Sequence, residues 1–290
     1  MYFRDETKEL NESTRKEATG SFIQLTDGVT HYELSNPEQA ETVILVHGFS
    51  VPYFIYDPTF EFLTTSGFRV VRYDLFGRGF SDRPDTLYNI DLFLRQLGDL
   101  MDALGLTRPV NLVGLSTGGP ITAAFTALHP QRVSRLVLID PVGAKPLPIS
   151  GLLKVATLPV VGETVISLLG TERMVKNITS DFSDRTFAEH FQSRYIIQMR
   201  YKGFKRAILS TIRNRMLDSF LGYYQRVSEM EKPVLLFWGR NDTTVPFRHS
   251  DTLRQVMPRI EFHAIEGCGH TPHYEKPKAV NPILLDFLRK

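Results

Sequence analysis

A serine stands between glycines in Gly114-Leu115-Ser116-Thr117-Gly118, which follows the apolar run 110–113 and precedes the helix-like run 120–125. A strand, a tight turn and a helix in this order would place the Ser116 hydroxyl at the apex of a strained bend, facing the N-terminus of the helix. Side chains at positions 114 and 118 would collide with the neighbouring strand or helix, so glycine suits both. The segment predicts a nucleophile elbow.

A serine hydroxyl is a poor nucleophile at neutral pH and needs a histidine base that is oriented by a carboxylate. Asp242 lies in a Gly-x-Asn-Asp turn just past the apolar run 234–238, and His270 lies in a Gly-Cys-Gly-His turn past the last strand-like run. Loops that follow parallel strands meet at one edge of a sheet. We therefore predict Ser116, His270 and Asp242 as nucleophile, base and acid.

Other residues compete for these roles. Asp74 and Asp140 also follow strand-like runs, and an aspartate in such a place is often only a turn or helix-cap residue. Asp242 is favoured by its turn and by the chain order nucleophile, acid, histidine. His273 lies three residues past His270 but lacks the preceding Gly-Cys-Gly turn.

The bulk composition bounds the class of protein. The 290 residues are 42% hydrophobic, enough for one large core with a modest second unit, and the net charge of +2 does not favour nucleic-acid binding. The single cysteine, Cys268, excludes an internal disulfide. The N-terminus has mixed charges, and Pro159, Gly162 and Glu163 interrupt the most apolar long segment. We expect a cytoplasmic protein without a signal peptide or a membrane span.

Strand-like and helix-like segments alternate along most of the chain. Residues 22–34 predict a hairpin with Asp27-Gly28 at its turn. Continuous apolar runs that predict buried parallel strands occur at 42–46, 68–73, 136–139 and 234–238, with a more polar edge strand at 260–265. Leucines three and four residues apart in 92–104, the run after Ser116 and residues 283–288 predict helices. The fold class is therefore α/β, with a mostly parallel open sheet flanked by helices.

The domain organisation follows from where this alternation stops. Residues 1–20 form a polar N-terminal tail, 21–142 the first part of the core and 226–290 the second part. Residues 143–225 lack the alternation and predict a helical cap over the carboxyl ends of the strands, where ligands bind in open α/β sheets. The alternative is that this segment simply continues the core.

Together with the elbow and the two turns, the motifs His47-Gly48-Phe49 and Asp74-Leu75-Phe76-Gly77-Arg78-Gly79-Phe80-Ser81 resemble the α/β-hydrolase superfamily, in particular its serine esterases and lipases. The resemblance implies that the backbone N–H groups of Phe49 and Thr117 form an oxyanion hole. It also implies that His47 holds the oxyanion loop and that the Asp74–Ser81 turn is structural. No cofactor and no metal are expected.

The reaction is less well defined than the fold. A serine nucleophile weighs against the dehalogenases and epoxide hydrolases of this superfamily, which need an aspartate there. Hydrolases of carbon–carbon bonds in ring-fission diketones typically carry a Gly-Gly-Gly-Pro-like oxyanion loop and a tryptophan after the catalytic histidine. This chain has Phe49-Ser50-Val51-Pro52 and Thr271 instead. We therefore expect hydrolysis of a short- to medium-chain carboxylic ester, such as a monoacylglycerol, through an acyl-enzyme. A carbon–carbon bond hydrolase and a ligand-binding pseudoenzyme are the alternatives.

The expected partner is a small-molecule ester with an apolar acyl group, and no nucleic acid. Candidate substrate-binding side chains are those of Tyr53, Phe54, Leu152 and Leu158. The segment 194–215 carries seven arginines and lysines among apolar residues. It predicts either a solvated helix face or a basic amphipathic helix in transient contact with a membrane surface, without stable insertion.

Overall fold

The fold was determined from a computed structural model of the chain. The structure describes residues 3, 5–35, 40–147, 157–158, 161–164, 166–167, 171, 174–175 and 185–290. Leu152 lies outside these residues.

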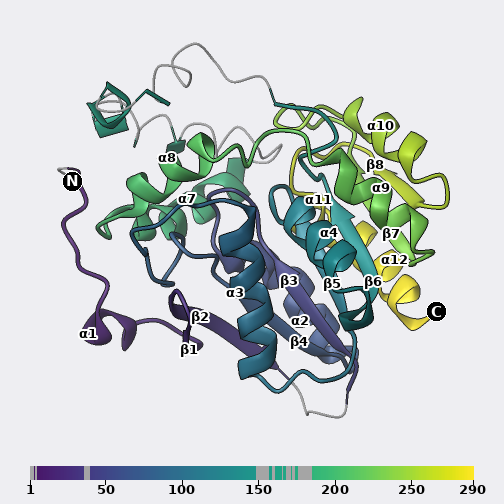
Figure 1. Ribbon diagram of the computed structural model, residues 1–290, viewed down its shortest axis with the longest axis horizontal. Helices are drawn as coiled ribbons and strands as arrows, with labels where there is room; N and C mark the ends of the chain where they lie inside the picture. The colour runs from purple at the N-terminus through teal and green to yellow at the C-terminus, as the bar shows by residue number, and fades with distance from the viewer. Residues whose placement is uncertain are drawn as a thin grey trace.

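An eight-stranded sheet forms the centre of the molecule, in the order β1-β2-β4-β3-β5-β6-β7-β8 (Figure 1). Its strands are β1 (Ser21–Leu25), β2 (Gly28–Ser35), β3 (Thr42–Val46), β4 (Arg69–Tyr73), β5 (Val110–Leu115), β6 (Val133–Ile139), β7 (Val234–Gly239) and β8 (Glu261–Ile265). The β1–β2 hairpin pairs antiparallel within itself and with β4, and the remaining neighbours are parallel. The mostly parallel α/β fold class is confirmed.

The burial of the strands depends on their place in the sheet. Every residue of β3, β4, β5 and β7 is buried, including the two arginines of β4, whereas β8 at the sheet edge is only half-buried. Alternate residues supply the two faces of the sheet: Ile44 and Val46 pack into one core cluster, while Val43 and Leu45 pack into the other.

Helices cover both faces of the sheet (Figure 1). One core cluster includes side chains of α3 (Ile90–Ala103), α4 (Gly118–Leu128), α9 (Leu221–Glu229) and α10 (His249–Val256). The other includes side chains of α2 (Asp57–Thr65) and α12 (Pro277–Arg289). The shorter helices are α1 (Glu12–Arg15), η1 (Tyr53–Tyr56), η2 (Pro130–Arg132) and α11 (Pro272–Glu275). Gly105, with a φ of 65°, directly follows the end of α3, as expected for a helix stop.

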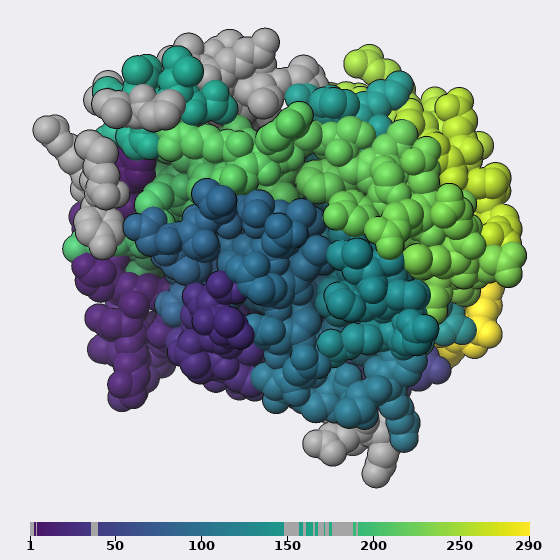
Figure 2. Space-filling model, viewed as in Figure 1, coloured from purple at the N-terminus to yellow at the C-terminus, as the bar shows by residue number. Residues whose placement is uncertain are grey.

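Two helices of the predicted cap are described, α7 (Arg185–Met199) and α8 (Phe204–Arg213). Residues of both contact the loops that follow β3 and β4, so they lie on the side of the strands' carboxyl ends. Figure 2 shows the green surface of this region above the blue surface of α3 and its flanking loop. Helix α9 runs through the predicted boundary at residue 225 and packs on α4 of the core. The outer limits of the cap stay a prediction.

The N-terminal segment is tied to α8. The buried Glu6 carboxylate accepts the N–H groups of Gly203 and Lys205, at 2.8 and 2.7 Å. The Lys205 ammonium, itself fully buried, lies 2.6 Å from both carboxylate oxygens of Asp5. The Glu6 carboxylate therefore satisfies backbone N–H groups at the start of this helix, which lack helical partners, while Asp5 pairs with the buried ammonium of Lys205.

Carboxylates neutralise most of the basic segment 194–215. Six of its cationic side chains form ion pairs: Arg194 with Asp57, Lys202 with Glu9, Lys205 with Asp5, Arg206 with Asp85, Arg213 with Glu163 and Arg215 with Asp218. These cationic side chains are thus paired within the protein, and contact of the segment with a membrane surface stays a prediction. Across the described residues, none of the helices combines the length and apolar character needed to cross a bilayer.

Candidate active site

Ser116 occupies the bend between β5 and α4. Its φ of 53° is in the left-handed region, which a serine adopts only where the surrounding structure imposes it. A Cβ on Gly114 would lie 2.4 Å from the Gly118 carbonyl oxygen, and one on Gly118 would lie 2.2 Å from the Val46 carbonyl oxygen. Strand β5, helix α4 and the end of β3 therefore approach too closely for any residue but glycine, as the elbow motif predicts.

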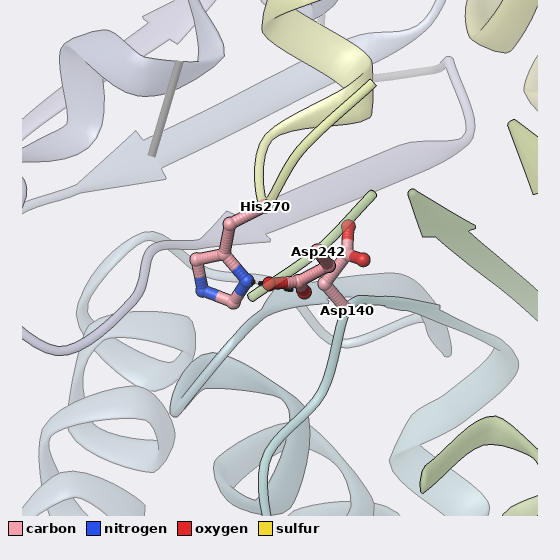
Figure 3. Close-up of side chains that lie close together, drawn as sticks. All are labelled: Asp140, Asp242 and His270. Atoms are coloured by element: carbon pink, nitrogen blue, oxygen red, sulfur yellow. Dashed lines mark hydrogen bonds and ion pairs between the residues drawn. The ribbon is translucent and has the colours of Figure 1, made fainter. Parts of the chain in front are cut away.

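The imidazole of His270 and the carboxylate of Asp242 are joined by a hydrogen bond (Figure 3). The Nδ1 atom of the histidine lies 2.7 Å from Oδ2 of the aspartate, and both residues are buried. The other oxygen, Oδ1, accepts the N–H groups of Thr244 and Val245, at 2.8 and 2.9 Å. Because a carboxylate only accepts, Nδ1 is the protonated nitrogen and Nε2 is left as the basic one.

Close backbone contacts join the turns after β5, β6, β7 and β8 into one rim. The Ser116 N–H donates to the Ile139 carbonyl at 2.9 Å, and the Asp140 side chain accepts the Gly239 N–H at 2.8 Å. A Cβ on Gly239 would lie only 1.9 Å from the Gly269 carbonyl oxygen, so the loops after β7 and β8 touch. The elbow and the histidine–aspartate pair thus share this rim.

A second carboxyl, that of Asp140, adjoins the pair (Figure 3). Ligand atoms of Asp140, Asp242 and His270 all lie within 4.8 Å of one another, in the only such group of three among the described residues. Asp140 is fully buried, and its Oδ2 has no hydrogen-bond partner in the described part of the chain. Burial and the neighbouring Asp242 raise the pKa of Asp140 well above its usual range. The raised pKa favours the neutral form of Asp140, and the carboxyl group that contacts the histidine is that of Asp242.

The three residues have the composition of a metal site, but their hydrogen bonds indicate a proton network. Both oxygens of Asp242 already accept N–H donors, and the Nδ1 atom of His270 carries a proton directed at one of them. A cation in this position would have to displace these donors.

The loop after β3 lies against the nucleophile. A Cβ on Gly48 would be 3.0 Å from the Ser116 Cβ. The Nδ1–H of His47 donates to the Gly48 carbonyl at 2.9 Å, while Nε2 accepts the Leu75 N–H at 2.9 Å. Burial lowers the pKa of His47 to about 4, so the ring stays neutral. Because the C=O and N–H of a trans peptide point in opposite directions, this bond orients the Phe49 N–H away from His47.

The second predicted oxyanion residue begins the helix behind the elbow. Thr117 is buried and occupies the N-cap position of α4. The helix therefore directs its N-terminal end, with its partial positive charge, at the bend that carries Ser116.

The rival histidine has different surroundings. His273 is fully buried, with its ring centroid 4.8 Å from that of Tyr56. Burial, with a smaller contribution from His270, lowers the pKa of His273 to about 3. A histidine with so low a pKa is a weak base at neutral pH.

Three of the predicted substrate-binding side chains, those of Tyr53, Phe54 and Leu158, belong to described residues. Tyr53 and Phe54 line a cavity of about 230 Å³ together with His31, Asp74 and Arg194, and neither Ser116 nor His270 is part of its lining. The Tyr53 ring stacks on His31, with centroids 4.8 Å apart. Leu158 is 52% exposed. The assignment of these side chains to substrate binding stays a prediction.

Two residues at the site could not be found from sequence patterns. Arg78 was expected only to stabilise its own turn, but its Nε–H donates to the Phe49 carbonyl at 2.8 Å. Gln198 of α7 donates to the Ser50 carbonyl, also at 2.8 Å. Because these pairs are far apart in the chain, no local spacing signals them.

Comparison with known proteins assigns the family. The alpha/beta hydrolase fold family matches residues 41–277. The chain belongs to this family of α/β hydrolases, and it is an enzyme of the hydrolase class.

More specific similarities concern one group of hydrolases. A 2-hydroxy-6-oxo-2,4-heptadienoate hydrolase of Pseudomonas putida is 30% identical over 76% of this chain and 78% of its own length. A 2-hydroxy-6-oxononadienedioate/2-hydroxy-6-oxononatrienedioate hydrolase of the same species is 33% identical over 87% of this chain and 89% of its own. A solved meta-cleavage product hydrolase of Pseudomonas fluorescens shares the fold, with a TM-score of 0.76, 24% identity, and coverage of 93% of this chain and 97% of that one.

These relatives correct the expectation of carboxylic ester hydrolysis, which is wrong as the main activity. They are hydrolases of 2-hydroxy-6-oxo-dienoates, the carbon–carbon bond hydrolases that stood as the alternative. The physical reason is that an elbow, a base and an oxyanion hole serve attack on a ketone as well as attack on an ester. The motifs do not encode the leaving group. The departures at Phe49-Ser50-Val51-Pro52 and at Thr271 therefore do not exclude hydrolysis of a carbon–carbon bond.

Proposed function

We propose that this chain hydrolyses a carbon–carbon bond in a 2-hydroxy-6-oxo-dienoate, with Ser116 as nucleophile, His270 as base and Asp242 as the acid that orients the base. The observation that carries the proposal is the 2.7 Å contact between His270 and Asp242 at the rim that bears Ser116. The similarity to dienoate hydrolases over most of the chain supports the substrate class.

The reaction needs a carbon leaving group that can hold an electron pair. Protonation at C5 and loss of the 2-hydroxyl proton convert the dienol into a 2,6-dioxo-3-ene. The Ser116 oxygen then attacks C6 while the Nε2 atom of His270 takes the hydroxyl proton. The backbone N–H groups of Phe49 and Thr117 stabilise the resulting oxyanion.

The intermediate then collapses. The C5–C6 bond breaks, and its electron pair passes through the conjugated chain to the 2-oxo oxygen. This oxygen takes up the proton that His270 received from Ser116 and becomes the 2-hydroxyl group of a dienoate. Water attacks the remaining acyl-enzyme with the help of the same imidazole and releases a carboxylic acid. The sum is one water consumed for one carbon–carbon bond broken.

The test is hydrolysis of 2-hydroxy-6-oxo-2,4-heptadienoate and of its 6-phenyl analogue. The conjugated substrates absorb strongly, so their loss is followed by absorbance, and the carboxylic acid products are identified by nuclear magnetic resonance. We expect turnover of at least one substrate, and loss of turnover in Ser116→Ala. The esters p-nitrophenyl acetate and p-nitrophenyl butyrate are measured in parallel.

The outcomes separate the reaction classes. Turnover of a dienoate with a higher kcat/KM than that of either ester supports the proposal. Efficient ester hydrolysis without cleavage of either dienoate would refute it, as would dienoate cleavage that persists in Ser116→Ala.

A further inference from the structure

The oxyanion loop, defined here as residues 48–51, is held by side chains that the proposed mechanism does not use. The Nε–H of Arg78 donates to the Phe49 carbonyl, and the Nε2–H of Gln198 donates to the Ser50 carbonyl, both at 2.8 Å. Both side chains are buried. Two consecutive peptide groups next to the predicted oxyanion donor are therefore fixed by residues outside the loop.

Arg78 is an unusual residue to bury. Its guanidinium forms no ion pair with any carboxylate of the described residues, and burial lowers the pKa of Arg78 only to about 10, so it stays charged. Its other donors reach the Phe76 carbonyl at 3.1 Å and the Thr211 hydroxyl at 2.8 Å. The ring of Phe49 lies 5.7 Å from its charged carbon. Burying a cation without a carboxylate partner costs free energy. The hydrogen bonds that offset this cost join the Arg78 guanidinium to the oxyanion loop, to its own turn and to the cap.

The cap reaches the oxyanion loop by two routes. Thr211 belongs to α8 and contacts Arg78, whereas Gln198 belongs to α7 and contacts Ser50 directly. The Oε1 atom of Gln198 also accepts the Gly79 N–H at 2.8 Å. One amide thus connects the cap, the loop after β3 and the loop after β4.

We propose that Arg78 and Gln198 are positioning residues that make assembly of the oxyanion hole depend on docking of the cap helices α7 and α8. An oxyanion donor is useful only within a few tenths of an ångström of its working position, so a loop without its anchors stabilises the transition state poorly. Displacement of the cap would remove the Gln198 and Thr211 contacts together. Enclosing the substrate and forming the oxyanion hole then become one event. The proposal rests on the proposed roles of Ser116 and Phe49.

The experiment compares Arg78→Met, Gln198→Leu and Thr211→Val with a matched control, Arg83→Met. Arg83 lies in the same loop after β4 and also donates to carbonyls, those of Ser81 and Gly79 at 2.7 and 2.8 Å, but no hydrogen bond joins it to the oxyanion loop. The first measurement is the second-order rate of Ser116 phosphonylation by a p-nitrophenyl phosphonate, which needs the oxyanion hole but no dienoate. The second is kcat and KM for the dienoate, and the third is the melting temperature.

We expect phosphonylation and kcat to fall together by about 10- to 100-fold in Arg78→Met and Gln198→Leu, with KM within about threefold of wild type. Thr211→Val should show a smaller fall of the same kind, and Arg83→Met should leave both rates unchanged. A folded Arg78→Met or Gln198→Leu protein that is phosphonylated at the wild-type rate would overturn the proposal, as would an equal fall in Arg83→Met. If Arg78→Met does not fold, the Gln198 and Thr211 variants decide. Failure of the wild type to cleave dienoates would refute only the substrate class, because phosphonylation still reports on the oxyanion hole.

Discussion

Oδ2 of Asp242 lies 2.7 Å from Nδ1 of His270, while Oδ1 of the same carboxylate accepts two backbone N–H groups. Asp242→Asn would present an amide in place of this acceptor and favour the wrong tautomer of the histidine. We expect kcat to fall by about 10⁴-fold, the size of the loss seen when a triad aspartate is replaced by asparagine. Steady-state kinetics on the dienoate provides the measurement.

The control for this change is Asp140→Asn. Asparagine keeps an oxygen for the Gly239 N–H and is neutral, like the protonated form that the raised pKa of Asp140 favours. We expect at most about a tenfold loss of kcat. A larger loss in Asp140→Asn than in Asp242→Asn would show that the acid has been assigned to the wrong strand end.

Asp140 should also make the stability of the protein depend on pH. Its folded pKa is raised, so above the ordinary value of 3.8 the unfolded chain loses a proton that the folded chain keeps. The stabilisation is complete below that value and is lost as pH rises toward the folded pKa, by about 1.4 kcal/mol per pH unit. Asp140→Asn removes this term. Urea denaturation from pH 5 to 8 should show a growing advantage for the variant, and parallel curves would contradict the prediction.

Ser116→Ala should remove the reaction without unfolding the protein. The loss of kcat should be about 10⁴-fold or more, because without the nucleophile only binding and the oxyanion hole remain. Phosphonate labelling, followed by mass spectrometry, should disappear while the circular dichroism spectrum is retained. Labelling that continues at another residue would assign the nucleophile elsewhere.

The glycines of the elbow should be intolerant of alanine for steric reasons. A Cβ on Gly118 would meet the Val46 carbonyl at 2.2 Å, and backbone there has little freedom to move. We expect Gly118→Ala to destabilise the protein by about 1–3 kcal/mol and to impair catalysis. The matched control is Gly222→Ala in helix α9, where a Cβ meets nothing within 4 Å and alanine favours the helix. Denaturation midpoints that fall equally in both variants would contradict the steric argument.

Local patterns in the sequence determined the sheet strands, the elbow and the turns of Asp242 and His270. They did so because strand burial, glycine spacing and turn chemistry involve residues close together in the chain. The order of these turns was enough to expect Ser116 and His270 at one sheet edge, since parallel strands end there together.

Tertiary structure alone decided which groups meet across long separations. Nothing near Asp140 in the sequence indicates that it adjoins Asp242, and nothing near Arg78 indicates that it holds the Phe49 carbonyl. The polar segment that contains Glu6 likewise gave no sign of its bonds to the start of α8. Such contacts depend on how separate elements pack, and hydrophobic periodicity carries no information about the partner of a buried charge. The motifs likewise did not determine the leaving group, because they encode attack on a carbonyl and not which bond of the intermediate then breaks.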